Sequence, residues 1–287
     1  MEVHWYPGHM ARGLRELKAK LSLVDVVVEL VDARAPQSTR NLQLGEALGD
    51  VPRLTVLSKA DLAEPGATRA WLAAYRREQG EALALERGVG RSYAQVRRRL
   101  QSFAPAVPPL IAKTMGKEYG RSVRALACGV PNVGKSSLIN QVTGRRGTKV
   151  GARPGVTRSQ QWLEGNGVAF LDTPGLLWPK LADPEQALCL VWLAAIDVER
   201  IDAVACAAAL FDRLLTQAAH VVAALCPGSP QSGEAALRQF ALRRGFTAAD
   251  GEPDTARAAA VALREFGAGK WGRVTLERAP SEGRARG

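Results

Sequence analysis

The segment GVPNVGKSS, residues 129–137, constrains the fold of this chain more than any other segment. Gly129, Gly134, Lys135 and Ser136 fill the fixed positions of the pattern G-x-x-x-x-G-K-[ST]. The glycines let backbone N–H groups approach phosphate oxygens, and a following helix points its positive end at the anion. The apolar run VRALACGV precedes the segment and the helical SSLINQVTG overlaps its end. This context predicts a phosphate-binding loop, with Lys135 on the β and γ phosphates and the Ser136 hydroxyl on Mg²⁺.

Two later motifs contain groups that suit the same site. In LDTPG, residues 171–175, we expect Asp172 to hold Mg²⁺ through water and the Gly175 N–H to bond the γ-phosphate. Between the two lies ARPGVTRSQ, in which Thr157 is a second hydroxyl for the ion when a triphosphate is bound. A plain loop threonine is the alternative for Thr157. These motifs together predict a nucleoside triphosphate site with magnesium.

The order of the motifs is unusual. VLSKADL, residues 56–62, has the form of a strand end followed by the Lys-x-Asp turn that recognises guanine, yet it precedes the phosphate loop. A nucleotide-binding sheet needs its loops in the right places in space, and moving the chain ends preserves the site. Rotating the usual order gives this one, with VDVVVELVDAR as the strand that normally follows DTPG and residues 104–122 joining the former ends. The sequence therefore predicts a circular permutation.

Strand and helix signals alternate through the first part of the chain, which predicts a mostly parallel α/β sheet with helices on both faces. The expected strands are 24–34, 53–57, 81–85 and 123–130, with two short ones in QWLE and VAFLDTPG, and the expected helices are 69–79, 93–103 and 136–144. From about residue 183 strand signals end and Ala-rich helical segments follow. We therefore predict two domains, a nucleotide-binding domain at 1–180 and a smaller all-helical domain at 181–287.

Composition limits the cellular setting and the partners. Hydrophobic residues make up 46% of the 287, enough for a core, and no apolar run reaches the roughly 18 residues that span a bilayer. The N-terminus lacks the apolar stretch of a secretion signal, and the four cysteines form no CxxC pair, so we expect reduced, mostly buried thiols and a cytoplasmic protein. The formal charge is +11, and residues 113–158 contain ten Lys/Arg against one acid, Glu118. This excess favours a polyanionic partner, with a solvated Arg-rich surface as the alternative.

Six blocks now carry a family resemblance: WYPGHMARG, ELVDARAPQSTRN, LSKADL, GVPNVGKSSLIN, RPGVTRSQQW and LDTPGLLWPK. In this order they resemble the circularly permuted GTPases of the YlqF/RbgA type, over about residues 3–180. GKWGRVTLERAP near the end is also similar to that family's tail. The resemblance implies GTP and GDP as ligands, Mg²⁺ as cofactor, and a role in assembly of the large ribosomal subunit. It also implies a helical C-terminal domain that contacts ribosomal RNA.

Two departures from the usual GTPase pattern concern guanine recognition. Ser58 stands where Asn is usual in Asn-Lys-x-Asp, and the shorter hydroxyl does only part of the work of bonding the base and bracing the phosphate loop. Asp61 still offers a carboxylate to the guanine ring N–H and amino group, and Lys59 is expected to stack its stem on the base. Residues 84–86, Ala-Leu-Glu, replace the usual Ser-Ala-Lys-like loop and offer backbone contacts at most.

A third departure concerns hydrolysis. Leu176 follows DTPG where many GTPases have a water-orienting glutamine, so intrinsic hydrolysis should be slow. The candidates for the missing group are His9, a basic residue of the partner, and a monovalent cation. His9 has packing or RNA contact as its alternatives. Asn132 suits potassium, because in related GTPases an asparagine there helps hold that ion; a loop-stabilising role is its alternative.

We therefore expect a GTPase that assembles the large ribosomal subunit, is stimulated by the particle and leaves it in the GDP state. The alternatives are a GTPase switch with a non-ribosomal partner and an RNA-binding module with a degenerate nucleotide site. A monomer is favoured. The expected catalytic residues are His9, Lys135 and Gly175; the metal ligands are Ser136, Thr157 and Asp172; and the nucleotide contacts are Ser58, Lys59, Asp61, Asn132, Val133, Gly134, Lys135, Ser136, Ser137, Thr157 and Gly175.

Overall fold

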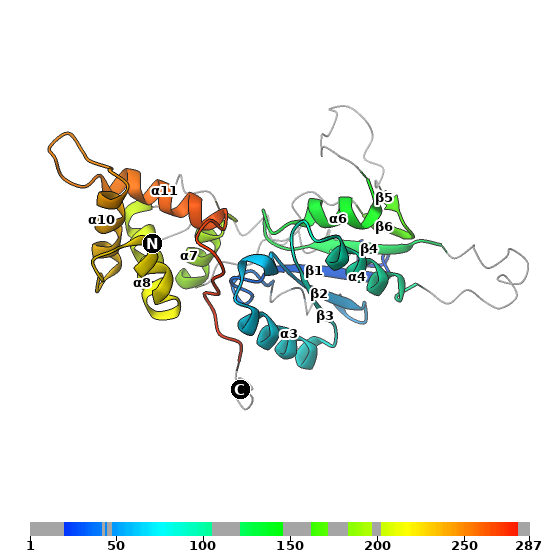
Figure 1. Ribbon diagram of the computed structural model, residues 1–287. Coiled ribbons are helices and arrows are strands. Elements are labelled where there is room, and N and C mark those ends of the chain that lie inside the picture. The colour runs from blue at the N-terminus through cyan, green and yellow to red at the C-terminus, as the bar shows by residue number, and fades with distance from the viewer. Residues whose placement is uncertain are drawn as a thin grey trace, which may run out of the picture.

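A six-stranded sheet forms one half of the molecule (Figure 1). The computed structural model describes residues 20–41, 44, 48–104, 121–145, 162–171, 183–196 and 202–280. The strands are β1 (Val26–Asp32), β2 (Arg53–Ser58), β3 (Ala82–Leu85), β4 (Val123–Cys128), β5 (Trp162–Gly165) and β6 (Val168–Leu171). Their order is β3-β2-β1-β4-β6-β5, and only β5 runs antiparallel to its neighbour. The mostly parallel sheet predicted from the sequence is confirmed.

Helices cover both faces of the sheet because the central strand is apolar on both sides. All seven residues of β1 are buried. Val26, Val28 and Leu30 pack with α4 (Gly90–Gln101) and α6 (Lys135–Thr143), whereas Val31 packs with Trp71 and Tyr75 of α3 (Pro65–Gln79). A strand buried on both faces is typically a near-continuous apolar run rather than an alternating one, and VVVELVD is apolar except at Glu29 and Asp32. Both expected helical layers are therefore present.

The carboxyl ends of three parallel strands meet at one edge of the sheet. In the register of the strands, Asp32 of β1 lies opposite Ser58 of β2, and Glu29 of β1 lies opposite Cys128 of β4. The early VLSKADL motif and the later phosphate loop thus leave the sheet at the same edge, on either side of β1. This arrangement is the one that the predicted rotation of the chain order requires.

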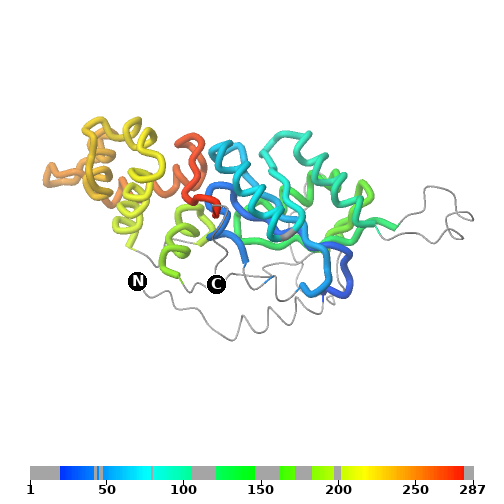
Figure 2. Tube along the Cα trace, turned by 90° about the horizontal axis from the view of Figure 1, so that it is seen from below, coloured from blue at the N-terminus to red at the C-terminus, as the bar shows by residue number. Residues whose placement is uncertain are grey.

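A second hydrophobic cluster lies beside the sheet, at the other end of the molecule (Figures 1 and 2). Its helices are α7 (Pro184–Trp192), α8 (Ala203–Gln217), α9 (Ala219–Leu225), α10 (Gly233–Arg243) and α11 (Thr255–Gly267). Trp271 packs in its centre against Phe211, Phe240 and Phe266. The long Ala-rich segment that begins at Ala203 is divided into α8 and α9 at Ala218, whose φ of −150° and ψ of 53° are not helical.

After α11 the chain returns to the sheet, which Figure 1 shows as the red segment running down beside α3. The Val274 N–H donates to the Leu62 carbonyl, and the Leu276 N–H donates to the Arg34 carbonyl at 2.7 Å. The half-buried Glu277 carboxylate accepts hydrogen bonds from Ser38 and from the Gln37 N–H. This returning segment, residues 274–277, fastens the helical cluster to the nucleotide-binding side.

All four cysteines are free and buried, as predicted. Burial raises the pKa of Cys189 to about 12, so this thiol stays protonated at neutral pH. Within the described part of the chain, no helix combines the length and apolar character needed to cross a bilayer.

Candidate functional site

The phosphate loop folds as its glycine pattern requires. Gly129 has a φ of +145°, and a Cβ there would lie 2.4 Å from the Leu30 carbonyl oxygen, so only glycine fits. Gly134, with a φ of +110°, precedes the first turn of α6. The Lys135 ammonium donates to the Gly129 and Val130 carbonyl oxygens, each at 2.9 Å. Burial lowers the pKa of Lys135, which is a cost of holding a cation inside the loop.

The N-terminus of α6 offers donors to an anion. Among the described residues no side chain caps this terminus, and its first turn contains no acidic residue. Ser136 and Ser137 lie in that turn with exposed side chains. Unsatisfied N–H groups, the helix dipole and the Lys135 ammonium together favour phosphate, and the Ser136 hydroxyl is a suitable oxygen ligand for Mg²⁺. These residues therefore fit a nucleotide phosphate with its metal ion.

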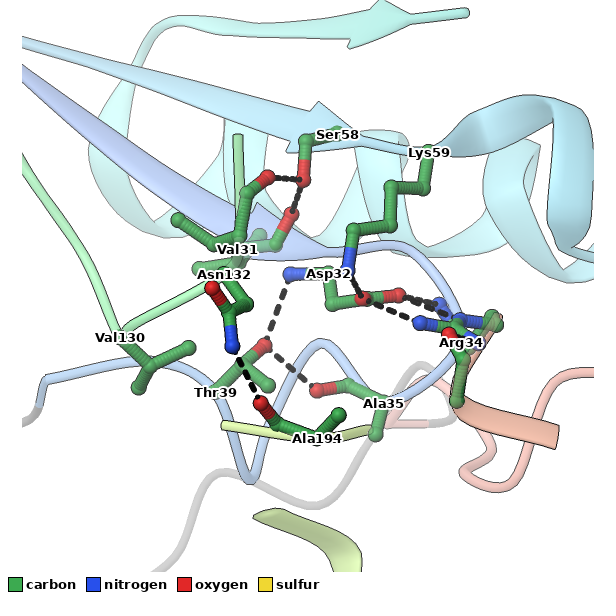
Figure 3. A network of polar contacts seen from close by, with 12 residues as sticks. Val31, Asp32, Arg34, Ala35, Thr39, Ser58, Lys59, Val130, Asn132 and Ala194 are labelled. Carbon is green, nitrogen blue, oxygen red and sulfur yellow. Dashed lines mark hydrogen bonds and ion pairs between the residues drawn. The ribbon is translucent and has the colours of Figure 1, made fainter. Parts of the chain in front are cut away.

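Ser58 braces the phosphate loop. Its buried hydroxyl lies 2.7 Å from the Val133 carbonyl oxygen and 3.1 Å from the Val31 carbonyl oxygen (Figure 3). A hydroxyl carries one proton, so it donates to one of these carbonyls at a time. The hydroxyl thus braces the phosphate loop, which is one of the two roles that an asparagine would have at this position. Contacts of Ser58 and Val133 with a nucleotide remain predictions.

Lys59 is anchored by a buried carboxylate. Its Nζ lies 2.9 Å from Oδ2 of Asp32, and its backbone φ of +55° is in the left-handed region. The Arg34 guanidinium holds both oxygens of the same carboxylate, through Nε at 3.0 Å and Nη2 at 2.9 Å. Burial alone would raise the pKa of Asp32, but Arg34 and Lys59 hold it well below its usual range. Asp32 is thus an anion between two cations, and it fixes the direction of the Lys59 side chain.

Asp61 is paired with a residue that the sequence interpretation missed. Its Oδ1 accepts from the Arg87 N–H at 2.9 Å, and its Oδ2 accepts from Nε of Arg87 at 3.0 Å. The sequence interpretation considered only backbone contacts with the base at residues 84–86, which remain a prediction, and did not consider Arg87. The available signal was a basic residue just after the strand beside β2. A carboxylate has about four acceptor positions, so Asp61 keeps acceptor capacity for the guanine edge.

Asn132 connects the phosphate loop to the helical cluster. Its Nδ2 donates to the Ala194 carbonyl oxygen at 2.7 Å, just after α7 (Figure 3). Both residues have φ in the left-handed region, +57° and +56°. The loop-stabilising alternative for Asn132 therefore has a partner in the structure, and its potassium contact remains a prediction.

The described residues bring Ser58, Lys59 and the loop 129–137 to one edge of the sheet. His9, Thr157, Asp172 and Gly175 lie outside the described residues, as does Leu176. Their expected roles remain predictions.

Known proteins are similar to this chain over most of its length. The family model of a 50S ribosome-binding GTPase matches residues 124–224. Ribosome biogenesis GTPase A of Priestia megaterium is 41% identical over 201 residues, 68% of each chain. Ribosome biogenesis GTPase A of Thermotoga maritima is 32% identical over 277 residues, 96% of this chain and 94% of its own. The solved GNP-bound YlqF from T. maritima has a TM-score of 0.63 at 28% identity, covering 93% of this chain and 98% of that one.

Proposed function

This chain belongs to the ribosome biogenesis GTPase A family and is a GTPase, and we propose that it acts as an assembly factor for the large ribosomal subunit. In this proposal the GTP form docks on the immature subunit, the particle stimulates hydrolysis, and the GDP form leaves. The observation that carries the proposal is the T. maritima relative, which aligns through both the sheet and the helical cluster. The protein would work in the cytoplasm, as a monomer, on ribosomal RNA.

Each residue of the site has a role in this proposal. Asp61 accepts the guanine ring N–H and amino group, Lys59 covers the base, and Lys135 neutralises the β and γ phosphates. Ser136, together with Thr157 and Asp172, would hold Mg²⁺. When bound, the ion neutralises charge that develops on the phosphate oxygens. The backbone N–H groups of Asn132, Val133, Gly134 and Ser137 bind phosphate oxygens, and the Gly175 N–H bonds the γ-phosphate.

Hydrolysis in this proposal needs a group that orients water. His9, a basic residue of the ribosomal particle and a potassium ion beside Asn132 are the candidates. Because Leu176 cannot orient water, the free protein turns over slowly and the particle accelerates it.

In this proposal the helical domain, residues 181–287, changes its position according to whether GTP or GDP is bound. The Asn132 side chain bonds Ala194, so the phosphate loop and the helical cluster share a direct contact. The segment with Asp172 and Gly175 leads into α7, and loss of the γ-phosphate would release it and shift the helices. The net charge of +11 supports an RNA partner, and binding should weaken strongly as salt rises.

GTP turnover with and without purified large ribosomal subunits, in potassium buffer, tests this function. ATP is the control nucleotide and Lys135→Ala is the control protein. We expect stimulation by the large subunit with GTP and none with ATP. If neither mature large subunits nor precursor particles raise GTP turnover, a ribosome-stimulated role is wrong.

A further inference from the structure

We infer that Arg34 is a positioning residue that transmits the position of helix α11 to the guanine-recognition loop. The inference rests on the proposed guanine site, and it adds a second link between nucleotide and helical domain besides the phosphate loop. The inference predicts that a partner or substitution that displaces α11 changes the affinity of the protein for GDP and GTP.

First, Arg34 and Lys59 are connected through the Asp32 carboxylate, with which both form ion pairs. The Arg34 side chain is 1% exposed and grips both oxygens of Asp32, while the second cation on that carboxylate is Lys59. A buried carboxylate shared by two cations holds its geometry only while both partners stay in place. Lys59 lies two residues before Asp61, so the direction of its side chain determines where its aliphatic stem can pack against the base.

The second step is the contact between Arg34 and α11. The remaining nitrogen of the guanidinium, Nη1, donates to the Phe266 carbonyl at 2.9 Å and to the Gly267 carbonyl at 3.2 Å. These are the last carbonyls of α11, where the helix dipole favours a cation. One planar guanidinium therefore joins the end of a helix in the second cluster to the carboxylate under the guanine loop.

The third step is that the phosphate loop reaches the same helix end. A Cβ at Gly267 would lie 3.2 Å from Cβ of Ala194, the residue whose carbonyl binds Asn132. Figure 3 shows Asp32 bonded to Arg34 and to Thr39, and the Asn132–Ala194 hydrogen bond as a separate contact in the same region. The base side and the phosphate side of the site thus converge on Phe266 and Gly267. A partner that displaces α11 would therefore weaken the contacts that position both the base-binding loop and the phosphate loop. By linkage, bound nucleotide would oppose that displacement.

The test compares Arg34→Lys, Arg34→Ala and the matched control Glu277→Ala in the full chain. Lysine can still pair with Asp32, but its point charge cannot span the carboxylate and the helix end. Glu277→Ala removes another contact between the returning segment and the sheet side, without touching Asp32. We expect both Arg34 variants to lose about tenfold in affinity for fluorescent GDP and GTP analogues, and the control to change by less than about twofold.

A double-mutant cycle separates transmission from general destabilisation. If Arg34 acts through Asp32 and Lys59, then Arg34→Ala adds little to the loss caused by Lys59→Ala. Additive losses, wild-type affinity in Arg34→Lys, or an equal loss in Glu277→Ala would each overturn the inference. These experiments need only nucleotide. A wild-type chain that does not prefer GDP to ADP would instead refute the guanine site itself.

Discussion

Ser58 stands where many GTPases have asparagine, and its hydroxyl retains one of the two roles expected of that asparagine, the bracing of the phosphate loop. It is buried, and it donates to the Val133 carbonyl of the phosphate loop or to the Val31 carbonyl of β1, one at a time. In the proposed site, base recognition would therefore depend on Asp61, whose carboxylate accepts two hydrogen bonds from Arg87. The sequence predicted Asp61 because the Lys-x-Asp spacing is local. It could not predict Arg87, since that contact depends on how β3 lies beside β2 and how the chain turns after it.

Asp61→Asn should change the nucleotide preference of the site from GTP to xanthosine triphosphate. Guanine presents two donors to the carboxylate, and an amide replaces one acceptor by a donor; losing one charge-assisted hydrogen bond reduces GTP affinity by about 100-fold. Xanthosine triphosphate, which carries a carbonyl in place of the amino group, should gain affinity. Equilibrium titration of both nucleotides measures this change. Glu64→Gln removes a nearby exposed charge and should leave both affinities as they are; unchanged GTP binding in Asp61→Asn would refute the assignment.

At the scale of the element, the phosphate loop was the most predictable part of the chain. Its glycines, its lysine and the flanking strand and helix are all determined within residues 123–143, so local pattern was sufficient. The contact between Asn132 and Ala194 was not predictable, because it joins elements from two hydrophobic clusters. The sheet was predicted well for the same reason as the loop: the β-branched run of β1 indicates burial on both faces.

Gly129→Ala should disrupt this element. The new methyl group would meet the Leu30 carbonyl at 2.4 Å, at a φ that L residues rarely adopt, so we expect a loss of about 3 kcal/mol in the free energy of unfolding. Denaturant unfolding measures the loss, and nucleotide binding should fall with it. The control is Gly90→Ala at the start of α4, where a Cβ meets no described atom within 4 Å and stability should hold or rise slightly. Equal stability of the two variants would contradict the strain argument.

At the scale of the whole molecule, the end of β2 contacts the phosphate loop through Ser58, and Arg34 and Ala194 connect this region to the end of α11. The helical segments were recognisable from their Ala-rich periodicity. The returning segment was not, because its hydrogen bonds to Arg34, Gln37, Ser38 and Leu62 cross more than two hundred positions of the chain. Contacts of that kind depend on packing between distant elements, and a single sequence carries no local signal for them.

In the proposed function, the bound nucleotide controls docking on the large ribosomal subunit. Co-sedimentation of the full chain with purified large ribosomal subunits, in GDP or in a non-hydrolysable GTP analogue, tests it most directly. Small subunits are the particle control and Lys135→Ala is the protein control. We predict that the chain sediments with large subunits in the analogue, stays in the supernatant with GDP, and loses binding as salt rises. Equal sedimentation in both nucleotides would contradict the account.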